Sequence, residues 1–596
     1  MPPGSVRTAI RPDRFTAAIT LTTVETLDPR PVIGIDLGTT NCALASSRGD
    51  AVEIFAILQF VHPGEVREEP LLPSFLFLDE SGPIVGVLAQ RKGLENPGRL
   101  VSSAKSWLSH SGIDRNAAIL PIDAPEGVPK VSAVDASRQY LLHLRDAWNT
   151  KQPDRPFDTH QVLVTVPASF DAVARDLTQR AAEEAGYRNI ILLEEPQAAF
   201  YAWIERNPGW RELVAPGDLI LVIDIGGGTT DFSLIAVKQQ DGEITLERIA
   251  VGDHILLGGD NIDSALAHHI ARDLPKKLDS IQFHALWQQC RIAKERLLEN
   301  GIAEKEQPIT ILGRGTGVVG GSIKTRLKRK DLDAILLDGF LPEVSLDAEP
   351  EGRRAGLTEL GLPYAADAAI TRHLAHFLHR NQASPTHVLF NGGVLRAGIV
   401  RKRILDVLNG WLPQPVTPLV SNDLMHAVAR GAAYYGFARQ GKGVRLSGGV
   451  PRTYYIGIEA AVPAVPGMRP PLKALTVVPF GMEEGTGHQI RDRQFALSVG
   501  ERAQFRIFQS VERKEDTAGL MLDEIPSGVE ETAPVEVLLS GEPGEIVPVT
   551  LESLVTETGV LELWFVARDG RRWKLEFNIR PQNARPKSEK RAKERA

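Results

Sequence analysis

One arrangement of apolar and polar positions occurs twice along the chain. Residues 219–237, LILVIDIGGGTTDFSLIAV, form an apolar run, a short polar centre and a second apolar run. Each flank has the length and the Val, Ile and Leu content of a buried strand, and the centre is too short for anything but a tight turn. Residues 32–46, VIGIDLGTTNCALAS, repeat the pattern. The sequence therefore predicts two β-hairpins with glycine-containing tips.

Further strands and helices are predicted around these hairpins. The apolar runs at 72–78 and 161–167 have the pattern of buried strands, and the segment from Asn96 to Leu108 has helical spacing. A Ser/Asp start and Gly186 as a stop predict a helix after residue 167. The apolar positions of that helix are Val173, Leu177, Ala181 and Ala185. The remaining elements are helices at 287–299 and 423–436 and a strand, Gly-Gly turn and helix at 388–404.

From about residue 452 the pattern changes to short alternating strands separated by turns, which is typical of a compact antiparallel sandwich. The predicted fold class is therefore α/β, followed by a small all-β sandwich domain. The predicted parts are a flexible leader (1–31), a first lobe (32–217), a second lobe (218–438), a Gly-rich linker (439–451), the sandwich (452–581) and a basic disordered tail (582–596).

Composition narrows the class of protein. The 596 residues are 43% hydrophobic and 24% charged, as in ordinary globular proteins. A net charge of −7 argues against nucleic acid as a partner, because no basic excess is available to neutralise phosphates. Two cysteines indicate a reducing compartment. Neither a membrane span nor an apolar signal segment is present, so a cytoplasmic protein is predicted.

The two hairpin tips carry the residue types of a phosphate site. Consecutive glycines let the backbone approach a ligand closely and turn its N–H groups toward phosphate oxygens. Asp224 enters the second turn and Asp231 leaves it, and Asp36 enters the first. Carboxylates at these positions suit hydrated Mg²⁺ held against phosphates. Two such turns predict one phosphate chain gripped from opposite sides; the alternative is two unrelated hairpins.

The tip sequences IGIDLGTTN and IDIGGGTTDFS resemble the actin-like ATPase superfamily, and in particular the seventy-kilodalton heat-shock chaperone family. The resemblance implies a two-lobed, duplicated ribonuclease-H-like ATPase that binds ATP and ADP. It implies Mg²⁺ at Asp36, Asp224 and Asp231, mostly through water, and K⁺ as a further candidate. The implied phosphate-binding residues are Gly38, Thr39, Thr40, Asn41, Gly226, Gly227, Gly228 and Thr229.

The same resemblance assigns catalytic and relay residues. Lys105 stands nine positions after Asn96, where the family has a catalytic lysine, and Glu195 in EEPQAA matches the glutamate of the family motif NEPTAA. Asp36 and Asp224 complete the implied catalytic set. The alternatives are a solvated helix lysine and a helix-start acid. VTVPASF resembles VTVPAYF, so Pro167 and Arg175 match interdomain relay positions; a corner with a surface arginine is the alternative.

Three segments resemble the nucleoside-binding motifs of the family. GGDNID, the helix at 287–299 and FNGGVLRAG imply that Gly258, Gly259, Arg291, Lys294, Gly392, Gly393 and Arg396 bind the nucleotide. The chain departs from the family pattern at Arg291, Glu295, Val394 and Met425. Because polar contacts to the nucleoside change at these positions, weaker or less selective purine binding is expected.

Two groups of residues suggest other chemistry. His373, His376 and His379 recur at every third position, but no Cys or acid completes a metal-ligand set. Cys42 lies beside the first turn and Cys290 on a predicted helix. One interpretation of the two cysteines is a redox switch. The alternative is that both are small buried hydrophobic residues.

The C-terminal part is matched more loosely. Val444 and Leu446 match the leucine-rich interdomain linker of the family only weakly. The segment YIGIEA resembles the start of the family's peptide-binding sandwich. The helical lid of the family is missing from the expected arrangement. The prediction is an ATP-hydrolysing chaperone that binds unfolded or extended polypeptides, with a J-domain protein and a nucleotide-exchange factor as partners. Alternatives are an ATP-dependent scaffold for one dedicated partner and a sugar or acetate kinase.

Overall fold

The computed structural model describes residues 31–578 with internal gaps. The gaps are residues 49–50, 111–112, 123, 189, 241, 254, 300–301, 303, 312–321, 353–361, 363, 422, 443, 445–449, 451, 464–470, 511, 533–534, 557 and 559. The predicted leader up to residue 30, Leu446 of the predicted linker and the predicted tail lie outside the described residues.

The first lobe is built on a sheet with the order β11-β10-β1-β2-β3. Its strands are β1 (Val32–Leu37), β2 (Asn41–Arg48), β3 (Ala51–Ile54), β10 (Gln161–Val166) and β11 (Ile190–Glu194). β1 to β3 are antiparallel, whereas β10 and β11 join in parallel. All six residues of β10 are buried, as expected for a central parallel strand. The packed helices include α3 (Ala133–Lys151) and α4 (Ala172–Glu184).

The second lobe repeats this topology with the order β14-β13-β12-β17-β18. Its strands are β12 (Leu219–Ile225), β13 (Thr230–Gln240), β14 (Glu243–Val251), β17 (His387–Asn391) and β18 (Thr417–Leu419). Again three antiparallel strands are followed by two parallel ones. Its helices include α6 (Gly259–Arg272), α7 (Ser280–Leu298), α9 (Ile370–Arg380) and α10 (Gly398–Trp411). The hairpin of each lobe is thus the same part of a duplicated unit.

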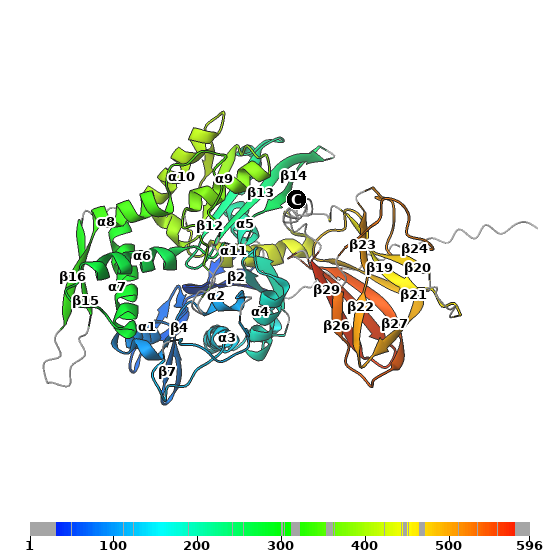
Figure 1. Cartoon of the computed structure of the whole chain (residues 1–596), viewed down its shortest axis with the longest axis horizontal. Coiled ribbons are helices and arrows are strands. Elements are labelled where there is room, and N and C mark those ends of the chain that lie inside the picture. Colours follow the sequence, from blue (N-terminus) through cyan, green and yellow to red (C-terminus); the bar gives the residue numbers. More distant parts are fainter. Residues whose placement is uncertain are drawn as a thin grey trace, which may run out of the picture.

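Two helices, α5 (Glu195–Arg206) and α11 (Ala427–Phe437), join the lobes (Figure 1). They share one hydrophobic cluster with residues of both sheets, such as Val32 and Val222. The helices cross very closely, because a Cβ at Gly431 would overlap the carbonyl oxygen of Ala198. This crossing fixes where α5, and therefore Glu195 at its first position, lies between the sheets.

Smaller elements extend each lobe away from the central helices. In the first lobe these are β4 (Ile57–His62), β5 (Glu65–Glu69), β6 (Leu72–Pro73), β7 (Leu76–Asp79), β8 (Gly82–Val85), α1 (Val87–Glu95), η1 (Pro97–Arg99), β9 (Leu100–Val101), α2 (Ala104–Leu108) and η2 (Phe157–Thr159). In the second they are β15 (Glu306–Ile311), β16 (Ile323–Lys328), α8 (Arg329–Ala334), the π-helix at Ile335–Phe340 and η5 (Gly393–Arg396).

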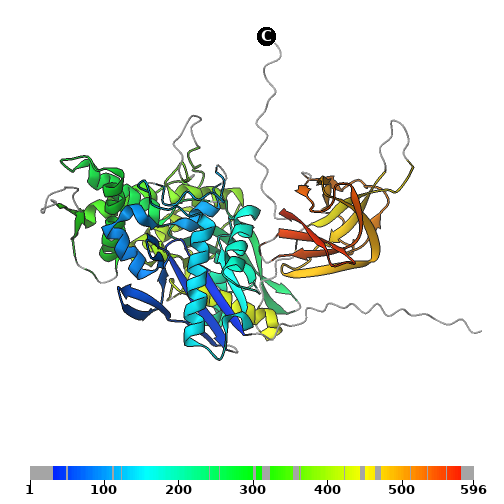
Figure 2. The same cartoon turned by 90° about the horizontal axis from the view of Figure 1, so that it is seen from below.

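The described residues after 452 form strands and loops only, beside the two lobes (Figures 1 and 2). One sheet has the order β24-β20-β19-β23-β25 and another the order β21-β27-β28-β29. Both contribute to one hydrophobic cluster that contains Tyr454, Leu475, Val499 and Leu563. The strands are β19 (Thr453–Glu459), β20 (Leu472–Val478), β21 (Thr486–Val499), β22 (Arg502–Phe505), β23 (Ile507–Ser510), β24 (Met521–Leu522), β25 (Glu530–Glu531), β26 (Val535–Leu538), β27 (Glu545–Val555), β28 (Val560–Ala567) and β29 (Arg572–Asn578).

Three local predictions were wrong. The strand expected at 72–78 is divided, because β6 pairs with β2 and β7 pairs with β8 and β9. The helix expected from 96 to 108 is interrupted by β9, and only α2 remains helical. Val173, expected on the buried face of α4, is 54% exposed. In the first two cases pairing with a distant strand overrides the local pattern.

Candidate functional site

The tips of the two repeated hairpins meet face to face. A Cβ at Gly227 would overlap Thr40 Oγ1, and one at Gly228 would lie 3.0 Å from Thr39 Cγ2. Only residues without side chains let the second tip come this close to the first. The sequence predicted two matching turns, and the structure places them on opposite sides of one cleft.

Each tip is held in shape by hydrogen bonds. In the first, Ser74 Oγ donates to the Gly38 carbonyl at 2.7 Å. In the second, the Gly226 amide donates to the Thr229 carbonyl at 2.9 Å. The start of α6 closes over this second turn, since the Gly259 amide donates to the Gly226 carbonyl at 3.0 Å. A rigid pair of turns and a helix N-terminus therefore surround the same space, an arrangement that favours phosphate groups.

A cavity of about 760 Å³ opens between the lobes at these tips. The predicted site residues that line it are Asp36, Gly38, Thr39, Thr40, Asn41, Lys105, Glu195, Asp224, Gly226, Gly227, Thr229, Gly259, Arg291, Lys294, Gly392, Gly393 and Arg396. Gly228 and Gly258 lie behind the lining, and a Cβ at Gly258 would be 2.7 Å from the Gly226 carbonyl oxygen. Asp231 is buried opposite Asp224 in the hairpin. Pro167 and Arg175 do not line the cavity.

Lys105 and Glu195 form an ion pair inside this cavity. The Lys105 ammonium donates to Glu195 Oε1, and the lysine side chain is 5% exposed. Burial lowers the pKa of Lys105, but Glu195 and Asp36 raise it by more, so its pKa stays above the ordinary value. Lys105 therefore stays charged at neutral pH, and it is not a solvated helix lysine. Its charge is available to an anionic ligand.

Three aspartates lie together at the hairpins: Asp36 and Asp224 line the cleft, and Asp231 is buried opposite Asp224. Burial, together with the charge of Glu195, raises the pKa of Asp36 to about 7 and that of Asp231 to about 7. Asp224 is affected most, for burial and its acidic neighbours raise its pKa well above the ordinary value. Asn391 Nδ2 donates to Asp224 Oδ2 at 2.7 Å and offsets part of this repulsion. In the ligand-free protein these three carboxyls therefore keep protons up to about neutral pH, because ionising all of them together is unfavourable.

This donor set fits a hydrated Mg²⁺ ion. Asn391 Oδ1 is buried without a hydrogen-bond partner, and the aspartates repel each other, so a divalent cation would satisfy both. No three His, Cys, Asp or Glu side chains among the described residues are arranged to bind a metal ion directly. Mg²⁺ commonly keeps several waters and takes only one or two carboxylates, with phosphates as other ligands. Asp36 and Asp224, which line the cavity, would hold such an ion.

The predicted ligands Arg291 and Lys294 are already paired with acids. Arg291 Nε donates to Asp263 Oδ2 at 3.1 Å, and its guanidinium also donates to Asp260 Oδ1. Lys294 Nζ lies 2.8 Å from Asp263 Oδ1. Asp260 further accepts a hydrogen bond from Ser103 of the first lobe. Both cations line the cavity, but their charges also join α7 to α6 within the second lobe, and Asp260 carries the contact to Ser103 of the first.

Sequence reasoning missed Ser103, Asp260, Asp263 and Asn391 at this site. Asp260 and Asp263 are within GGDNID, the segment that gave Gly258 and Gly259, so their acidity was a usable signal. Ser103 has a left-handed backbone, with φ of 53°, and it precedes the helix that carries Lys105. A backbone of this kind is rare outside glycine and is found where surrounding contacts enforce it.

The far end of the cavity contains the positions where the chain departs from the family pattern. Gly392 has φ of 93°, and a Cβ there would lie 2.6 Å from Asp224 Oδ1. Val394, Arg396 and Met425 line the cavity beyond it. Glu295 lines it too, and burial raises the pKa of this carboxyl. This end offers one guanidinium, one acid and two apolar side chains to a ligand.

The cysteines and histidines take other roles. Burial raises the pKa of Cys42 to about 12, and it raises that of Cys290 as well, so both thiols stay protonated. Cys42 Sγ is 3.3 Å from Ser74 Oγ. On α9, His373 Nε2 lies 3.0 Å from the Asp367 carbonyl and His376 Nδ1 lies 2.6 Å from Glu349.

Two copies of one sheet order, with facing hairpin tips and a cavity between them, are the architecture of the actin-like class of proteins. Comparison with protein families agrees. The family described as "Hsp70 protein" matches residues 32–341, which is more than half of the chain. The chain belongs to the Hsp70 family.

Curated relatives give the same family. The chain is 34% identical to a chaperone protein HscA homolog from Bordetella pertussis over 285 residues, which cover 46% of this chain and 42% of the relative. It is 29% identical to the Delftia acidovorans homolog over 331 residues, covering 51% and 46%. For the Burkholderia lata homolog, 29% identity extends over 420 residues, covering 68% and 58%. The chain spans about half the length of the curated relatives it matches.

Proposed function

We propose that the chain is an Hsp70-type molecular chaperone that hydrolyses ATP to ADP and phosphate. The observation that carries this proposal is the meeting of the two hairpin tips around Lys105 and Glu195 in one cavity. A triphosphate placed there has backbone amides on both sides, a buried ammonium and carboxylates at its end. The Hsp70 family and the relatives named as chaperones support it.

The residues suggest how hydrolysis proceeds. The glycines and threonines of the two tips bind and orient the phosphates, and Lys105 stabilises negative charge that develops on the terminal phosphoryl group. Glu195 holds Lys105 in position and orients the attacking water beside it. Bound Mg²⁺ supplies neutralisation of the phosphate oxygens. Water attacks the terminal phosphorus, and the bond to the bridging oxygen of ADP breaks.

The proposal assigns polypeptide binding to the C-terminal sheets, as a β-sandwich that holds extended apolar segments of other proteins. An extended segment binds a sheet through main-chain hydrogen bonds and pockets for alternate side chains. ATP-dependent closure of the lobes would alter that grip, with a J-domain protein and a nucleotide-exchange factor as regulators. In the part of the chain that the structure describes, no helix combines the length and hydropathy needed to cross a bilayer.

Lys105→Ala and Asp224→Ala test the catalytic assignment. Each variant should lose ATP hydrolysis by a factor of about 100 or more, because charge stabilisation in the cleft is removed. Nucleotide should still bind, as measured by isothermal titration calorimetry. Lys92→Ala on α1 serves as the matched control, because Lys92 pairs with Asp79 and does not line the cavity, and it should hydrolyse ATP as the wild type does. Wild-type turnover in either cavity variant would contradict the mechanism.

Chaperone function is tested by refolding of a denatured reporter enzyme with a J-domain partner. We expect ATP-dependent recovery with the wild type and none with Lys105→Ala. A capture experiment with and without ATP adds a second readout. Recovery of many unfolded proteins supports the chaperone, whereas one partner and no refolding would support a scaffold.

A further inference from the structure

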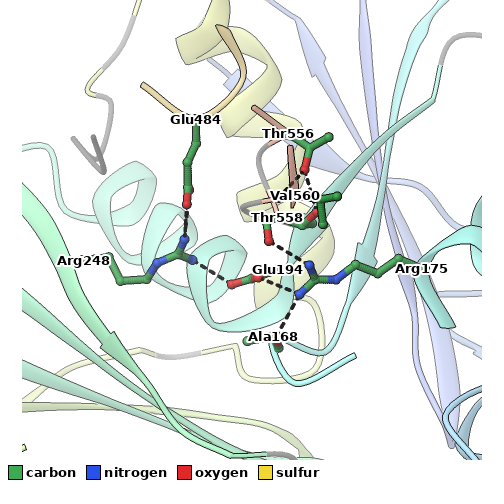
Figure 3. A network of polar contacts seen from close by, with 8 residues as sticks. All are labelled: Ala168, Arg175, Glu194, Arg248, Glu484, Thr556, Thr558 and Val560. Atoms are coloured by element: carbon green, nitrogen blue, oxygen red, sulfur yellow. Dashed lines mark hydrogen bonds and ion pairs between the residues drawn. The ribbon is translucent and has the colours of Figure 1, made fainter. Parts of the chain in front are cut away.

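Glu194 is a buried carboxylate shared by two arginines from different lobes (Figure 3). It ends β11 and is inaccessible to solvent. Its Oε1 accepts a hydrogen bond from Arg175 at 3.2 Å, and its Oε2 accepts one from Arg248 at 2.7 Å. Arg175 lies on α4 of the first lobe and Arg248 on β14 of the second. One side chain therefore links the lobes.

Both arginines also reach the C-terminal sheets. Arg175 donates to the Thr558 carbonyl at 2.8 Å, and Arg248 donates to the two carboxylate oxygens of Glu484 at 2.9 and 3.1 Å. Glu484 precedes β21, and Thr558 lies in the turn between β27 and β28. Because Thr486 pairs with Val555, these two contacts lie at the same end of the C-terminal sheet. The C-terminal domain is thus held at two points, one through each lobe.

The burial of these charges makes the contacts interdependent. The side chains of Arg175 and Arg248 are 7% and 9% exposed. A buried charge that loses its partner strongly destabilises the fold. The network is therefore stable either when all of its contacts are made or when its charged groups are exposed to water. Rotation of one lobe against the other would move Arg175 relative to Arg248, and Glu194 cannot follow both. Docking of the C-terminal domain therefore requires one relative orientation of the lobes.

The same carboxylate is next to the cavity in the chain. Glu194 directly precedes Glu195, which accepts the hydrogen bond of Lys105. We propose that Glu194 is a positioning residue through which docking of the C-terminal sheets depends on closure of the two lobes around their ligand. The identification of that ligand as ATP rests on the proposed function. The sharing of the Glu194 carboxylate between the two arginines is independent of it.

This inference goes beyond the relay that the sequence suggested. The resemblance gave Pro167 and Arg175, whereas nothing in the sequence marked Arg248 or Glu484. Pro167 precedes Ala168, whose carbonyl accepts a third hydrogen bond from Arg175 at 3.0 Å. Arg175 is therefore held both by the Ala168 carbonyl, in the turn after β10, and by the carboxylate of Glu194, which ends β11.

Distances between spin labels in the full-length chain test the proposal. Labels at Glu183→Cys on α4 and Glu536→Cys on β26 occupy exposed positions, and the native Cys42 and Cys290 are buried. We expect a short and a long distance in the ligand-free wild type, and the short one represents the docked state. Glu484→Gln should lower the docked-to-undocked ratio about tenfold or more, because the Arg248 pair loses its charge. Glu483→Gln, an exposed neighbouring acid, is the matched control and should change nothing.

A double-mutant cycle tests whether Glu194 is shared. Arg175→Lys and Arg248→Lys should each reduce docking, and the double variant should lose little more, since either change already breaks the network. Additive effects would show two independent contacts and overturn the proposal. Wild-type docking in Glu194→Gln would also overturn it.

The effect of nucleotide on docking is the third test. Saturating Mg–ATP should raise the docked fraction of the wild type but not that of Glu194→Gln, with ATP affinity measured by calorimetry in the same samples. ATP that binds without changing wild-type docking would overturn the dependence on closure. If the wild type binds no ATP, the proposed function fails, while the Glu484 comparison and the double-mutant cycle still decide whether the carboxylate is shared.

Discussion

Two groups of buried or partly buried charged side chains in the lobes differ in how their charges are balanced. Asp36, Asp224 and Asp231 lie together without enough cations. Arg291, by contrast, is matched by Asp260 and Asp263. Repulsion between carboxylates is therefore left at the position where a phosphate-bound cation is proposed, and it is offset between α6 and α7 of the second lobe.

Stability of the ligand-free protein should decrease as the pH rises from 4 to 7. The pKa of Asp231 is 3.8 in its ordinary state and about 7 in the fold, and Asp36 has the same shift. Between these values the folded state binds more protons than the unfolded state, so raising the pH disfavours folding, and the loss is complete above 7. Asp231→Asn should flatten the dependence of the melting temperature on pH in EDTA. Parallel curves for variant and wild type would contradict the pKa assignment.

Arg291→Gln should lower the free energy of unfolding by about 3 kcal/mol, because two buried carboxylates lose their partner. Arg296→Gln on the same helix is the control. Its side chain is 50% exposed and pairs with Glu299 at 3.2 Å, so the change should be within about 0.5 kcal/mol. Urea unfolding of both variants provides the measurement. Equal free energies of unfolding for the Arg291→Gln variant and the wild type would show that Arg291 contributes to ligand binding rather than to stability.

Sequence reasoning at this scale found most residues that line the cavity, because short motifs fix chemistry and spacing together. It did not find their partners. Glu194, Asp260 and Asn391 interact with residues that are distant in the chain, at Arg248, Arg291 and Asp224. Such pairs depend on which segments the fold brings together, and no local pattern contains that information.

At the scale of elements, the hairpins were predictable because alternation and apolar length specify strands directly. The interrupted segment at 96–108 was not. Its Leu100 and Val101 pair with β7, so a sheet partner determines their conformation. The close crossing of α5 and α11 was also hidden, since one glycine among several in a helix gives no signal by itself.

Gly431→Ala should destabilise the protein by about 3 kcal/mol, because the added methyl group forces α11 away from α5. Gly410→Ala, in α10, is the matched control. A Cβ there meets nothing within 4 Å, and alanine favours helix by up to about 1 kcal/mol. Thermal and urea unfolding of both variants give the comparison. A mild effect at position 431 would mean that the helices can separate without loss.

At the scale of the whole molecule, the duplicated lobes could be predicted from the repeated hairpin, and the structure extends the repeat to the complete order of five strands. The C-terminal region was predictable only as a set of short strands. Its two long strands, β21 and β27, were not foreseen, because polar residues interrupt their alternation. The domain boundaries themselves stay predictions.

Mg²⁺ should control how much nucleotide stabilises the lobes. ATP at about 100 times its dissociation constant adds roughly 2.7 kcal/mol to the folded state. Because three buried aspartates repel the phosphates, EDTA should abolish most of the resulting increase in melting temperature. Differential scanning calorimetry with ATP, with and without EDTA, measures it. An equal increase in both conditions would exclude the aspartates as cation ligands.

Glu194 and Glu195 are neighbours, one facing the C-terminal sheets and the other the cavity. Adjacent Cα atoms are only about 3.8 Å apart. Substitutions at the two positions can therefore change the contacts with the C-terminal sheets and the contacts in the cavity independently of each other. Exchanging the first glutamate changes how the C-terminal sheets are held while the cavity residues stay as they are, so family members with identical cavities can differ in the attachment of their C-terminal sheets.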